Sequence, residues 1–483
     1  LWTVTRGFHV VVKRDSGFQP VRSFGASAPT MSLFHFAAGD AQAGDGYRIL
    51  LESSKWGDEH GFEAVWTPER HFHDFGAPYP NPSVVAAAVA AVTERIEIRA
   101  GSVVLPLHSP VRVAEEWSVV DNLSNGRVGI SFAAGWQPND FVLNPAGYAN
   151  AREELADRIE AVRELWRGET VELPGPDGEL VPVRTLPRPV QAELPVWLTS
   201  AGSPASFERA GTLGVNLLTH LLGQSIEQLT ENIERYRAAY RAAGHEGEGK
   251  VTLMLHTFLD PDGDHARETA REPLTQYLGT AVGLIKNMAS AFPTFAGAGK
   301  DADEAFRSLT DADIRQLLEM AADRYLSTSG LFGTVEDALD MVDASARAGV
   351  DEVACLIDFG IDADLVLPSL QLLGEVHDRI EHDEGEIETV ASLIERYGVT
   401  HLQCTPSLAS MLMADPTERA ALARLDHMMV GGEALPTELA RELTDVVAGR
   451  VTNMYGPTET TIWSLTHDLE RGADGPVAIG RPI

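Results

Sequence analysis

Positive charge is scarce in this sequence. Its 483 residues include 38 lysines and arginines against 71 aspartates and glutamates, which gives a formal net charge of −33 at pH 7. Nucleic acids and anionic membrane surfaces attract proteins through basic faces, and a chain with this charge balance offers few of them. We therefore expect neither nucleic acid nor membrane among its partners.

Cysteine is equally scarce, and long apolar runs are missing. The only two cysteines, Cys355 and Cys404, lie inside apolar stretches, which predicts buried thiols in a reducing cytoplasm and excludes a disulfide framework. No window approaches the roughly 18 apolar residues that a membrane-spanning helix needs. The first residues also lack the basic-then-apolar order of a secretory signal. A cytoplasmic location follows as the expectation.

The sequence lacks an initiating methionine, and its end at Arg481-Pro482-Ile483 has no terminal character, so we interpret it as a piece of a longer polypeptide. Its length predicts two or three domains. Composition suggests three segments: residues 1–29 as a linker or the edge of a preceding domain, 30–380 as a first domain, and 381–483 as a second that begins at an acidic joint.

The first domain alternates apolar strand-like runs with amphipathic helices. Such strands joined by helical crossovers indicate a parallel sheet, and eight repeats favour a closed (β/α)8 barrel over an open doubly wound sheet. No G-x-G-x-x-G turn follows the first strand, which weakens the open-sheet alternative. The expected strands are 32–38, 62–66, 96–105, 127–134, 196–200, 215–219, 251–259 and 352–357. The expected helices are 47–60, 82–92, 111–123 (ending at Asn125-Gly126), 153–166, 205–213, 226–243 and 335–348, with a helical insertion at about 266–325.

Ionisable residues are concentrated directly after the second expected strand. Glu69, Arg70, His71 and His73 place a carboxylate, a guanidinium and two imidazoles within five residues. Barrel enzymes present their chemistry at the carboxyl ends of strands, so this loop is the first candidate for an active site. The alternative is an exposed polar loop with a structural ion pair. No zinc-like spacing relates these histidines to His60, and we expect no metal.

A second candidate follows the fifth strand, where Thr199-Ser200-Ala201-Gly202-Ser203 precedes Pro204. Small residues with free backbone N–H groups at the start of a helix form an anion site, to which serine hydroxyls add donors. This turn could hold a phosphate, with Ser203 as N-cap. The alternative is an ordinary capped helix after a tight turn.

Four segments in order resemble the bacterial luciferase-like, flavin-dependent monooxygenases over roughly residues 31–380. They are Glu69-Arg70-His71-Phe72 with Asp74-Phe75-Gly76 and Asn81-Pro82; Val103-Val104-Leu105-Pro106 with Pro110-Val111-Arg112 and Asp121 to Arg127; Gly129-Ile130 with Gly135-Trp136 and Asp140-Phe141; and the turn at 200–203. Each segment is weak alone, whereas the four together are specific.

The resemblance implies a luciferase-like TIM barrel that binds reduced FMN at its carboxyl face and reacts it with O2. A non-proline cis peptide at Gly101-Ser102 would support the flavin ring, and Gly135, Trp136 and the turn from Thr199 to Ser203 would contribute to the site. His71 is the candidate for proton transfer and Glu69 for orienting the loop. The family's first histidine is Arg70 here, and a phosphate-binding arginine of the family aligns with Ala134. His220 and His256, at strand ends, could line the pocket or be satisfied structural histidines.

The last hundred residues resemble part of an adenylation domain of nonribosomal peptide synthetases. Asn453-Met454-Tyr455-Gly456-Pro457-Thr458-Glu459 looks like the fifth core motif of that family, and Gly431-Gly432-Glu433 like the turn beside the adenine. The implied nucleotide contacts are Gly432, Glu433, Tyr455, Gly456, Thr458 and Glu459. The phosphate loop, the pocket aspartate and the catalytic lysine of that family are missing from this sequence. ATP and Mg²⁺ are therefore expected only for a complete domain.

The family's amino-acid pocket can be carried over position by position, and the resulting set is similar to a glycine-selecting pocket. It comprises Gln403, Met429, Gly431, Met454, Ile462 and Trp463. The resemblance thus implies a monooxygenase inserted into an adenylation domain of a glycine-activating, terminal-amide-forming module.

In such a module the barrel would hydroxylate the Cα of glycine on a carrier protein. Its partners would be a carrier-bound aminoacyl or peptidyl thioester, the rest of the synthetase and a separate flavin reductase, because no nicotinamide site is visible. Two alternatives stay open: N-hydroxylation or other oxygenation of a different tethered aminoacyl or polyketide group, and a non-catalytic barrel that spaces synthetase domains.

Overall fold

The computed structural model describes most of the chain and divides it into two compact units. One unit comprises residues 25–381, and the other comprises residues 1–24 together with 382–483. The described residues are 9–14, 17–20, 28–37, 45–72, 76–135, 137–280, 311–385, 389–397, 399–455, 465–472, 477–478 and 480–482. No helix among them is both long enough and apolar enough to cross a membrane.

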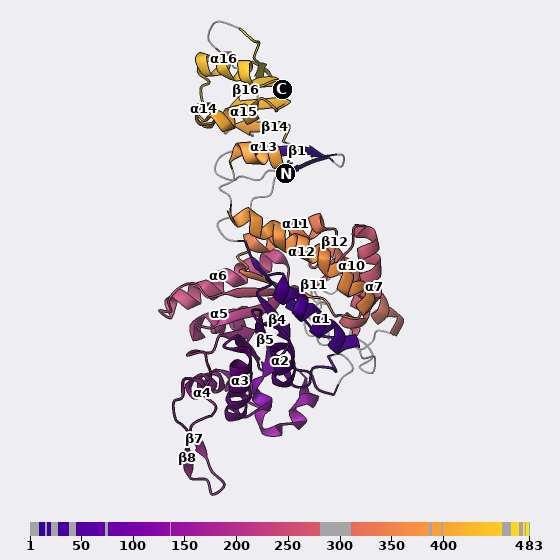
Figure 1. Cartoon of the computed structure of the whole chain (residues 1–483), viewed down its shortest axis with the longest axis vertical. Helices are drawn as coiled ribbons and strands as arrows, with labels where there is room; N and C mark the ends of the chain where they lie inside the picture. Colours follow the sequence, from indigo (N-terminus) through magenta and orange to yellow (C-terminus); the bar gives the residue numbers. More distant parts are fainter. Residues whose placement is uncertain are drawn as a thin grey trace. The chain divides into compact units, whose positions relative to one another are not determined.

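Eight parallel strands of the larger unit close into a barrel. Each strand pairs with the next, β11 pairs with β13 and β13 with β3, and a pairing of β10 with β11 completes the ring. The expected (β/α)8 fold is thus confirmed (Figure 1). The strands are β3 (Thr30–Phe34), β4 (Ala64–Thr67), β5 (Glu97–Val104), β6 (Val128–Ala133), β9 (Val196–Thr199), β10 (Asn216–His220), β11 (Val251–Leu259) and β13 (Glu352–Leu356).

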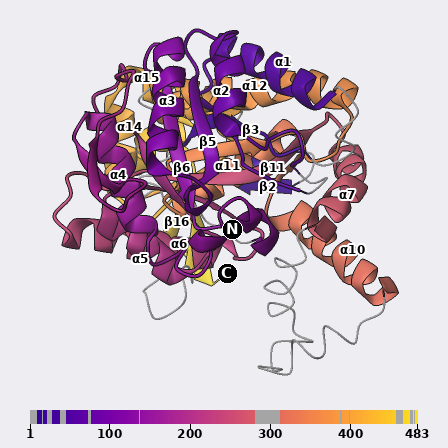
Figure 2. The ribbon, with the colours of Figure 1, turned by 90° about the horizontal axis from the view of Figure 1, so that it is seen from below.

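Helices surround the barrel because each carries an apolar stripe toward the strands; Figure 2 shows α1, α2 and α3 outside β3 and β5. Asn125 adopts the left-handed conformation that ends α3, as the sequence predicted. The helices are α1 (Asp45–Glu59), α2 (Pro82–Ala90), α3 (Pro110–Ser124), α4 (Leu155–Arg167), α5 (Pro204–Leu213), α6 (Ile226–Ala242), α7 (Gly263–Thr280), α10 (Asp311–Thr328), α11 (Val335–Arg347) and α12 (Ala363–Gly385).

Several elements of this unit differ from the expectation. A hairpin of β7 (Val171–Pro174) and β8 (Leu180–Val183) precedes β9, and a short strand β12 (Leu331–Gly333) pairs with β11 in a segment for which no element was expected. Short 3-10 helices, η1 (Leu105–Leu107), η2 (Pro138–Val142) and η3 (Pro145–Gly147), follow β5 and β6. Within the helical insertion expected at about 266–325, the structure describes α7 and α10, and residues 281–310 lie outside the described residues. The polar segment expected as a joint is helical up to Gly385.

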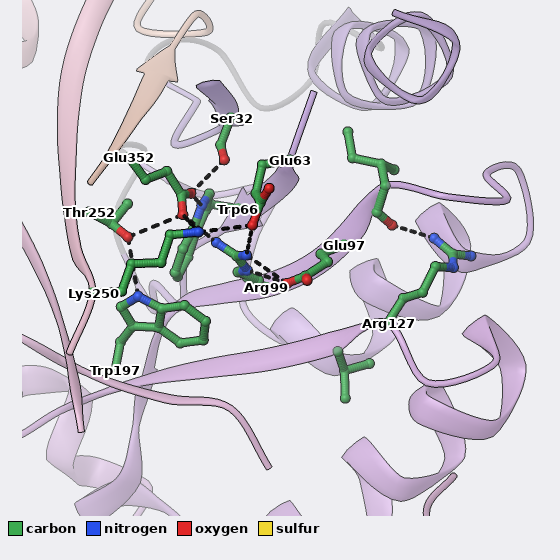
Figure 3. Close-up of polar contacts among 12 residues, drawn as sticks. Ser32, Glu63, Trp66, Glu97, Arg99, Arg127, Trp197, Lys250, Thr252 and Glu352 are labelled. Carbon is green, nitrogen blue, oxygen red and sulfur yellow. Dashed lines mark hydrogen bonds and ion pairs between the residues drawn. The ribbon is translucent and has the colours of Figure 1, made fainter. Parts of the chain in front are cut away.

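The amino-terminal end of the barrel interior is filled by a charged layer (Figure 3). The Arg99 guanidinium lies over the rings of Trp66 and Trp197, at 5.1 and 4.6 Å from their centroids, and donates to Glu352 at 2.7 Å. Lys250 Nζ lies 3.1 Å from the same carboxylate. Burial alone would raise the pKa of Glu352, but the charges of Arg99 and Lys250 outweigh it and lower this pKa to about 2. Because this layer fills the amino-terminal end of the barrel, we expect an active site at the carboxyl end.

The smaller unit is a mixed sheet covered by helices. Strand β1 (His9–Arg14) pairs antiparallel with β14, so segments from both flanks of the barrel share one sheet. The strands β2 (Gly17–Pro20), β14 (His401–Cys404), β15 (His427–Gly431), β16 (Arg450–Tyr455), β17 (Leu465–Asp468) and β18 (Arg481–Pro482) lie in the order β18-β17-β16-β15-β14-β1-β2. The helices are α13 (Val390–Tyr397), α14 (Pro406–Ala414), α15 (Pro416–Leu422) and α16 (Thr437–Val446).

Candidate active site at the carboxyl end of the barrel

Glu69 is the centre of a hydrogen-bonded cluster just beyond β4. Its carboxylate accepts hydrogen bonds from His71 Nε2 at 2.8 Å, from His108 Nε2 at 2.5 Å and from the backbone N–H of Val104 at 2.7 Å. The Glu69 side chain is fully buried, whereas His71 and His108 are 11% and 31% exposed. The structure therefore joins the predicted Glu69 and His71 and adds His108, which the sequence analysis missed.

Glu69 and His108 each stabilise the charged form of the other. Burial alone would raise the pKa of Glu69, but the hydrogen bonds from His108, His71 and Val104 outweigh it and hold this pKa below its usual value. Burial would likewise lower the pKa of His108, and the hydrogen bond and charge of Glu69 raise it instead. Glu69 is thus held as a carboxylate that stabilises the protonated imidazole of His108.

The same three residues could hold a metal ion, because their ligand atoms lie within 4.8 Å of one another. Among the residues that the structure describes, no other group of three or more histidine, cysteine, aspartate or glutamate side chains has its ligand atoms this close together. Their mutual hydrogen bonds already satisfy the Glu69 carboxylate, so the arrangement is explained without an ion.

Arg70 lies apart from this cluster. Its guanidinium is 3% exposed and lies 3.9 Å from the carboxylate of Asp140 in η2. Burial lowers the pKa of Arg70, and the negative charge of Asp140 opposes that shift. From the sequence, Arg70 is a candidate catalytic residue beside Glu69 and His71. The structure shows it in a buried ion pair across two loops of the barrel end.

The expected cis peptide between Gly101 and Ser102 is present in β5. A Cβ on Gly101 would lie 2.8 Å from the Phe34 ring and 3.1 Å from Trp66, so the strand needs glycine there. Ser102 Oγ lies 2.5 Å from Thr199 Oγ1, which is also 2.6 Å from Ser131 Oγ. Two predicted site residues from strands β5 and β9 are thereby brought into contact.

The predicted anion turn retains unused donors. Ser200 is 4% exposed, and its hydroxyl has no hydrogen-bond partner among the described residues. Ser203 is the N-cap of α5 but makes no side-chain capping bond, and Gly202 has a φ of +106°, which favours glycine. Ala201 is exposed between them. Because a buried hydroxyl is normally paired, Ser200 fits a ligand rich in acceptor oxygens, such as a phosphate.

Two further expectations concern the loop after β6. Gly135 follows the strand with a φ of +83°, and a Cβ there would lie 2.9 Å from Val104. Trp136 lies outside the described residues, as does His73.

Asp358, just beyond β13, is a buried carboxyl group that the sequence analysis did not identify. It accepts hydrogen bonds from the backbone N–H of Phe36 at 2.5 Å and from the Tyr79 hydroxyl at 3.0 Å. Burial raises the pKa of Asp358 to about 7. Its place directly after a barrel strand was the available signal, because polar residues at such positions face the barrel mouth.

In the smaller unit, four predicted pocket residues share one face of the sheet. Gln403 pairs with Met429, and Gly431 two residues on pairs with Met454. Residues two apart on a strand face the same side, so these four lie together. Ile462 and Trp463 lie outside the described residues.

The predicted nucleotide residues are described in part. Gly432 has a φ of +92°, and the Glu433 carboxylate accepts hydrogen bonds from the backbone N–H and hydroxyl of Ser407, so it also caps α14. Tyr455 ends β16. The remaining three, Gly456, Thr458 and Glu459, lie outside the described residues.

Two family models match this sequence. The model described as luciferase-like monooxygenase matches residues 29–352, and that described as AMP-binding enzyme matches residues 331–483. Residues 331–352 fall in both matches, and the structure places them in the barrel unit.

Known proteins resemble the two parts separately. The chain is 24% identical over 333 residues to the oxygenase component of a flavin-dependent trigonelline monooxygenase of Acinetobacter baylyi, covering 68% of this chain and 89% of that protein. It is 44% identical over 98 residues to a dimodular nonribosomal peptide synthase of Bacillus subtilis, but this covers 20% of the chain and 4% of the synthase.

Among solved structures, the fold is similar to the oxygenating constituent of 3,6-diketocamphane monooxygenase of Pseudomonas putida, a type II Baeyer-Villiger monooxygenase in complex with FMN. The TM-score is 0.57 at 18% identity, with 73% of this chain and 98% of that one covered. Since the first family model spans about two thirds of the sequence and the barrel has the matching fold, this chain belongs to the luciferase-like monooxygenase family, here fused to an AMP-binding region of the peptide-synthetase kind.

Proposed function

We propose that the barrel is a flavin-dependent monooxygenase that uses reduced FMN and O2 to hydroxylate the Cα of a glycine held on a carrier protein. The observation that carries the cofactor assignment is the buried hydroxyl of Ser200, in the turn that precedes α5, which has no hydrogen-bond partner among the described residues. A helix start with unused donors at the carboxyl end of a barrel strand suits a flavin phosphate.

The residues around this turn have distinct roles in the proposal. Ser200 and Ser203, with the backbone of the turn, would hold the phosphate, and Ser102 and Thr199 would lie beside the ring system. Reduced FMN, when bound, supplies the two electrons that O2 needs to be split. The barrel supplies a site that orients the substrate and limits access of water.

His71 is the proposed proton carrier. Its Nε2–H donates to Glu69, so the other ring nitrogen, Nδ1, is the atom that can take up or deliver a proton. The Glu69 carboxylate fixes which ring nitrogen of His71 carries the hydrogen and holds the ring in place, as a buried carboxylate does for a catalytic imidazole. His108 supplies the second hydrogen bond that keeps Glu69 oriented.

The proposed reaction replaces one C–H bond of the glycine Cα with C–OH. One oxygen atom of O2 enters the product, the other leaves as water, and the two electrons come from the reduced flavin. The product is a carbinolamide. When its hydroxyl loses a proton, the C–N bond breaks and the nitrogen takes up a proton, which leaves a primary amide and a glyoxylyl thioester.

The proposal that glycine is the substrate rests on residues of the smaller unit. Gln403, Met429, Gly431 and Met454 share a sheet face at positions of the family's amino-acid pocket. Together with Ile462 and Trp463 they are similar to a glycine-selecting set, in which Trp463 and the other large side chains would leave little space beyond a hydrogen. The pairing of β1 with β14 supports an arrangement in which the barrel is inserted into an adenylation domain. We place the protein in the cytoplasm, with a separate reductase as the source of reduced flavin.

The experiment is a product analysis under ¹⁸O2. The purified chain, reduced FMN and a carrier protein loaded with an acylglycyl thioester should yield a primary amide and a glyoxylyl thioester that contains one ¹⁸O before exchange. The Ser200→Ala/Ser203→Ala double variant should lose most of this activity at low flavin concentration. Oxygen on nitrogen, or on another tethered acyl group only, would overturn the glycine assignment. Absence of any oxygenated product would overturn the proposal.

A further inference from the structure

His256 points into the barrel interior at its carboxyl end. Thr252 in the same strand, β11, donates to the interior carboxylate of Glu352, and side chains alternate along a strand, so His256 faces inward as well. It pairs with Leu356, the last residue of β13, which places it at the barrel mouth. It is 0% exposed in the structure.

One nitrogen of this imidazole is bonded and the other has no partner. Nδ1 lies 3.1 Å from the Tyr325 hydroxyl, whereas Nε2 has no hydrogen-bond partner among the described residues. Burial lowers the pKa of His256 to about 3, so the ring is neutral and carries one hydrogen. The buried Tyr325 hydroxyl needs an acceptor, and Nδ1 provides it; the hydrogen of the ring then lies on Nε2.

His220, the last residue of β10, presents a second neutral donor nearby. The backbone N–H of Leu222 donates to its Nδ1 at 3.3 Å, which leaves the ring hydrogen on Nε2. Burial lowers the pKa of His220 to about 4, so it too is uncharged at neutral pH. Strands β10 and β11 are adjacent, and His220 pairs with Met254, two residues before His256, so the two neutral imidazoles belong to neighbouring strands at this part of the mouth.

The surroundings of His256 are apolar and aromatic. The rings of Tyr277 and Phe359 lie 4.4 and 5.3 Å from its centroid. Strand β10 separates β11 from β9, which carries the anion turn, so the two histidines stand beside the proposed flavin site rather than within it. A neutral N–H in an aromatic wall suits an uncharged carbonyl oxygen better than an anion, because no positive charge compensates its desolvation.

We propose that His256 is a substrate-positioning residue whose Nε2–H donates to a carbonyl oxygen of the acylated glycine, with His220 as its neighbour for the second carbonyl. This inference rests on the proposed function. An acylglycyl thioester has one carbonyl on each side of the reacting Cα, so two donors would fix the carbon between them. The same donors would favour amide- and thioester-flanked carbons over simple alkanes or amines.

The test compares His256→Phe, which keeps a planar ring without an N–H, with His256→Gln, which restores a donor. Affinity for reduced FMN is measured anaerobically, and KM, kcat and hydrogen peroxide release are measured with an acylglycyl pantetheine thioester. We expect His256→Phe to raise KM about tenfold and to increase peroxide release, with the flavin affinity changed less than twofold. His256→Gln should recover part of the KM.

Thermal unfolding without ligands supplies the control. Because His256→Phe also removes the acceptor of the buried Tyr325 hydroxyl, we expect it to lower the melting temperature by a few degrees; the change in KM, measured well below that temperature, reports the separate loss of the Nε2–H donor.

Three other outcomes are decisive. A large fall in flavin affinity at unchanged KM would place His256 against the cofactor and overturn the inference. A lower melting temperature with unchanged kinetics would make it structural. Failure of the parent chain to bind reduced FMN would instead overturn the proposed function.

Discussion

Glu352→Gln is the most informative test of what holds the barrel together. The carboxylate is fully buried and accepts hydrogen bonds from Arg99 at 2.7 Å, from Trp66 Nε1 at 3.0 Å and from Ser32 at 2.5 Å. The amide keeps the shape but removes the charge, so Arg99 remains buried with its main counterion gone. Breaking a buried pair in this way costs about 3–5 kcal/mol of unfolding free energy.

For a barrel of roughly 350 residues, an unfolding entropy of about 2 cal/mol/K per residue converts this loss into a fall of about 4–7 °C in melting temperature. Differential scanning calorimetry measures it directly. Because folding lowers the pKa of Glu352 to about 2, its contribution is present above the ordinary glutamate pKa and is lost as pH falls from about 4.5 through 2. The difference between parent and variant should shrink over that pH window.

Glu97→Gln is the matched control, because this partner of Arg99 is 41% exposed and its loss should cost less than about 1 kcal/mol. The Arg99→Met/Glu352→Gln double variant should be more stable than Glu352→Gln alone, since it removes the uncompensated charge. If Glu352→Gln has the same melting temperature as the parent, this layer is not an interdependent ion-pair network.

Three further predictions concern the carboxyl end of the barrel. Glu69→Gln should lower kcat about 10- to 100-fold with little change in reduced-flavin affinity, as measured by oxygen uptake, because His71 loses a charged hydrogen-bond partner; unchanged kcat would argue against a role in proton transfer. Ser200→Ala should weaken flavin binding about tenfold in a fluorescence titration but leave the ligand-free melting temperature unchanged, since its hydroxyl has no hydrogen-bond partner among the described residues; a lower melting temperature would contradict this. Burial raises the pKa of Asp358 to about 7, so ionising this carboxyl group destabilises the folded parent as pH rises from about 4 to 7. Asp358→Asn should therefore gain up to about 4 kcal/mol of unfolding free energy relative to the parent over that range, and the difference should stay constant above it. Urea unfolding at pH 5 and pH 8 measures this difference, and an equal value at both pH values would contradict the raised pKa.

The sequence predicted the barrel well because its strands are short apolar runs between amphipathic helices, a pattern that local residue order carries. Element ends moved by a few residues, as at β3, which begins at Thr30 and ends at Phe34 rather than at 38. The pairing of β1 with β14 could not be predicted, because the partners are separated by the whole barrel. Strand β12 has only three residues and offers too little pattern to recognise.

The site was predicted in its parts but not in its contacts. Glu69 and His71 are two residues apart, and their proximity follows from the sequence. His108 reaches the same carboxylate only because β4 and β5 are neighbours in the barrel, and the Ser102–Thr199 contact likewise needs closure of the ring. Our proposal for His256 rests on its hydrogen bonds, which emerge only from packing and could not be predicted from the sequence.

An anaerobic titration of the purified chain with reduced FMN, followed by admission of O2 in the presence of an acylglycyl carrier, tests the central claim most directly. The account predicts saturable binding at one flavin per chain, weakened in Ser200→Ala, and oxygen consumption that matches amide formation. A chain that binds no reduced FMN, or that consumes oxygen without ever oxygenating the tethered substrate, would contradict it.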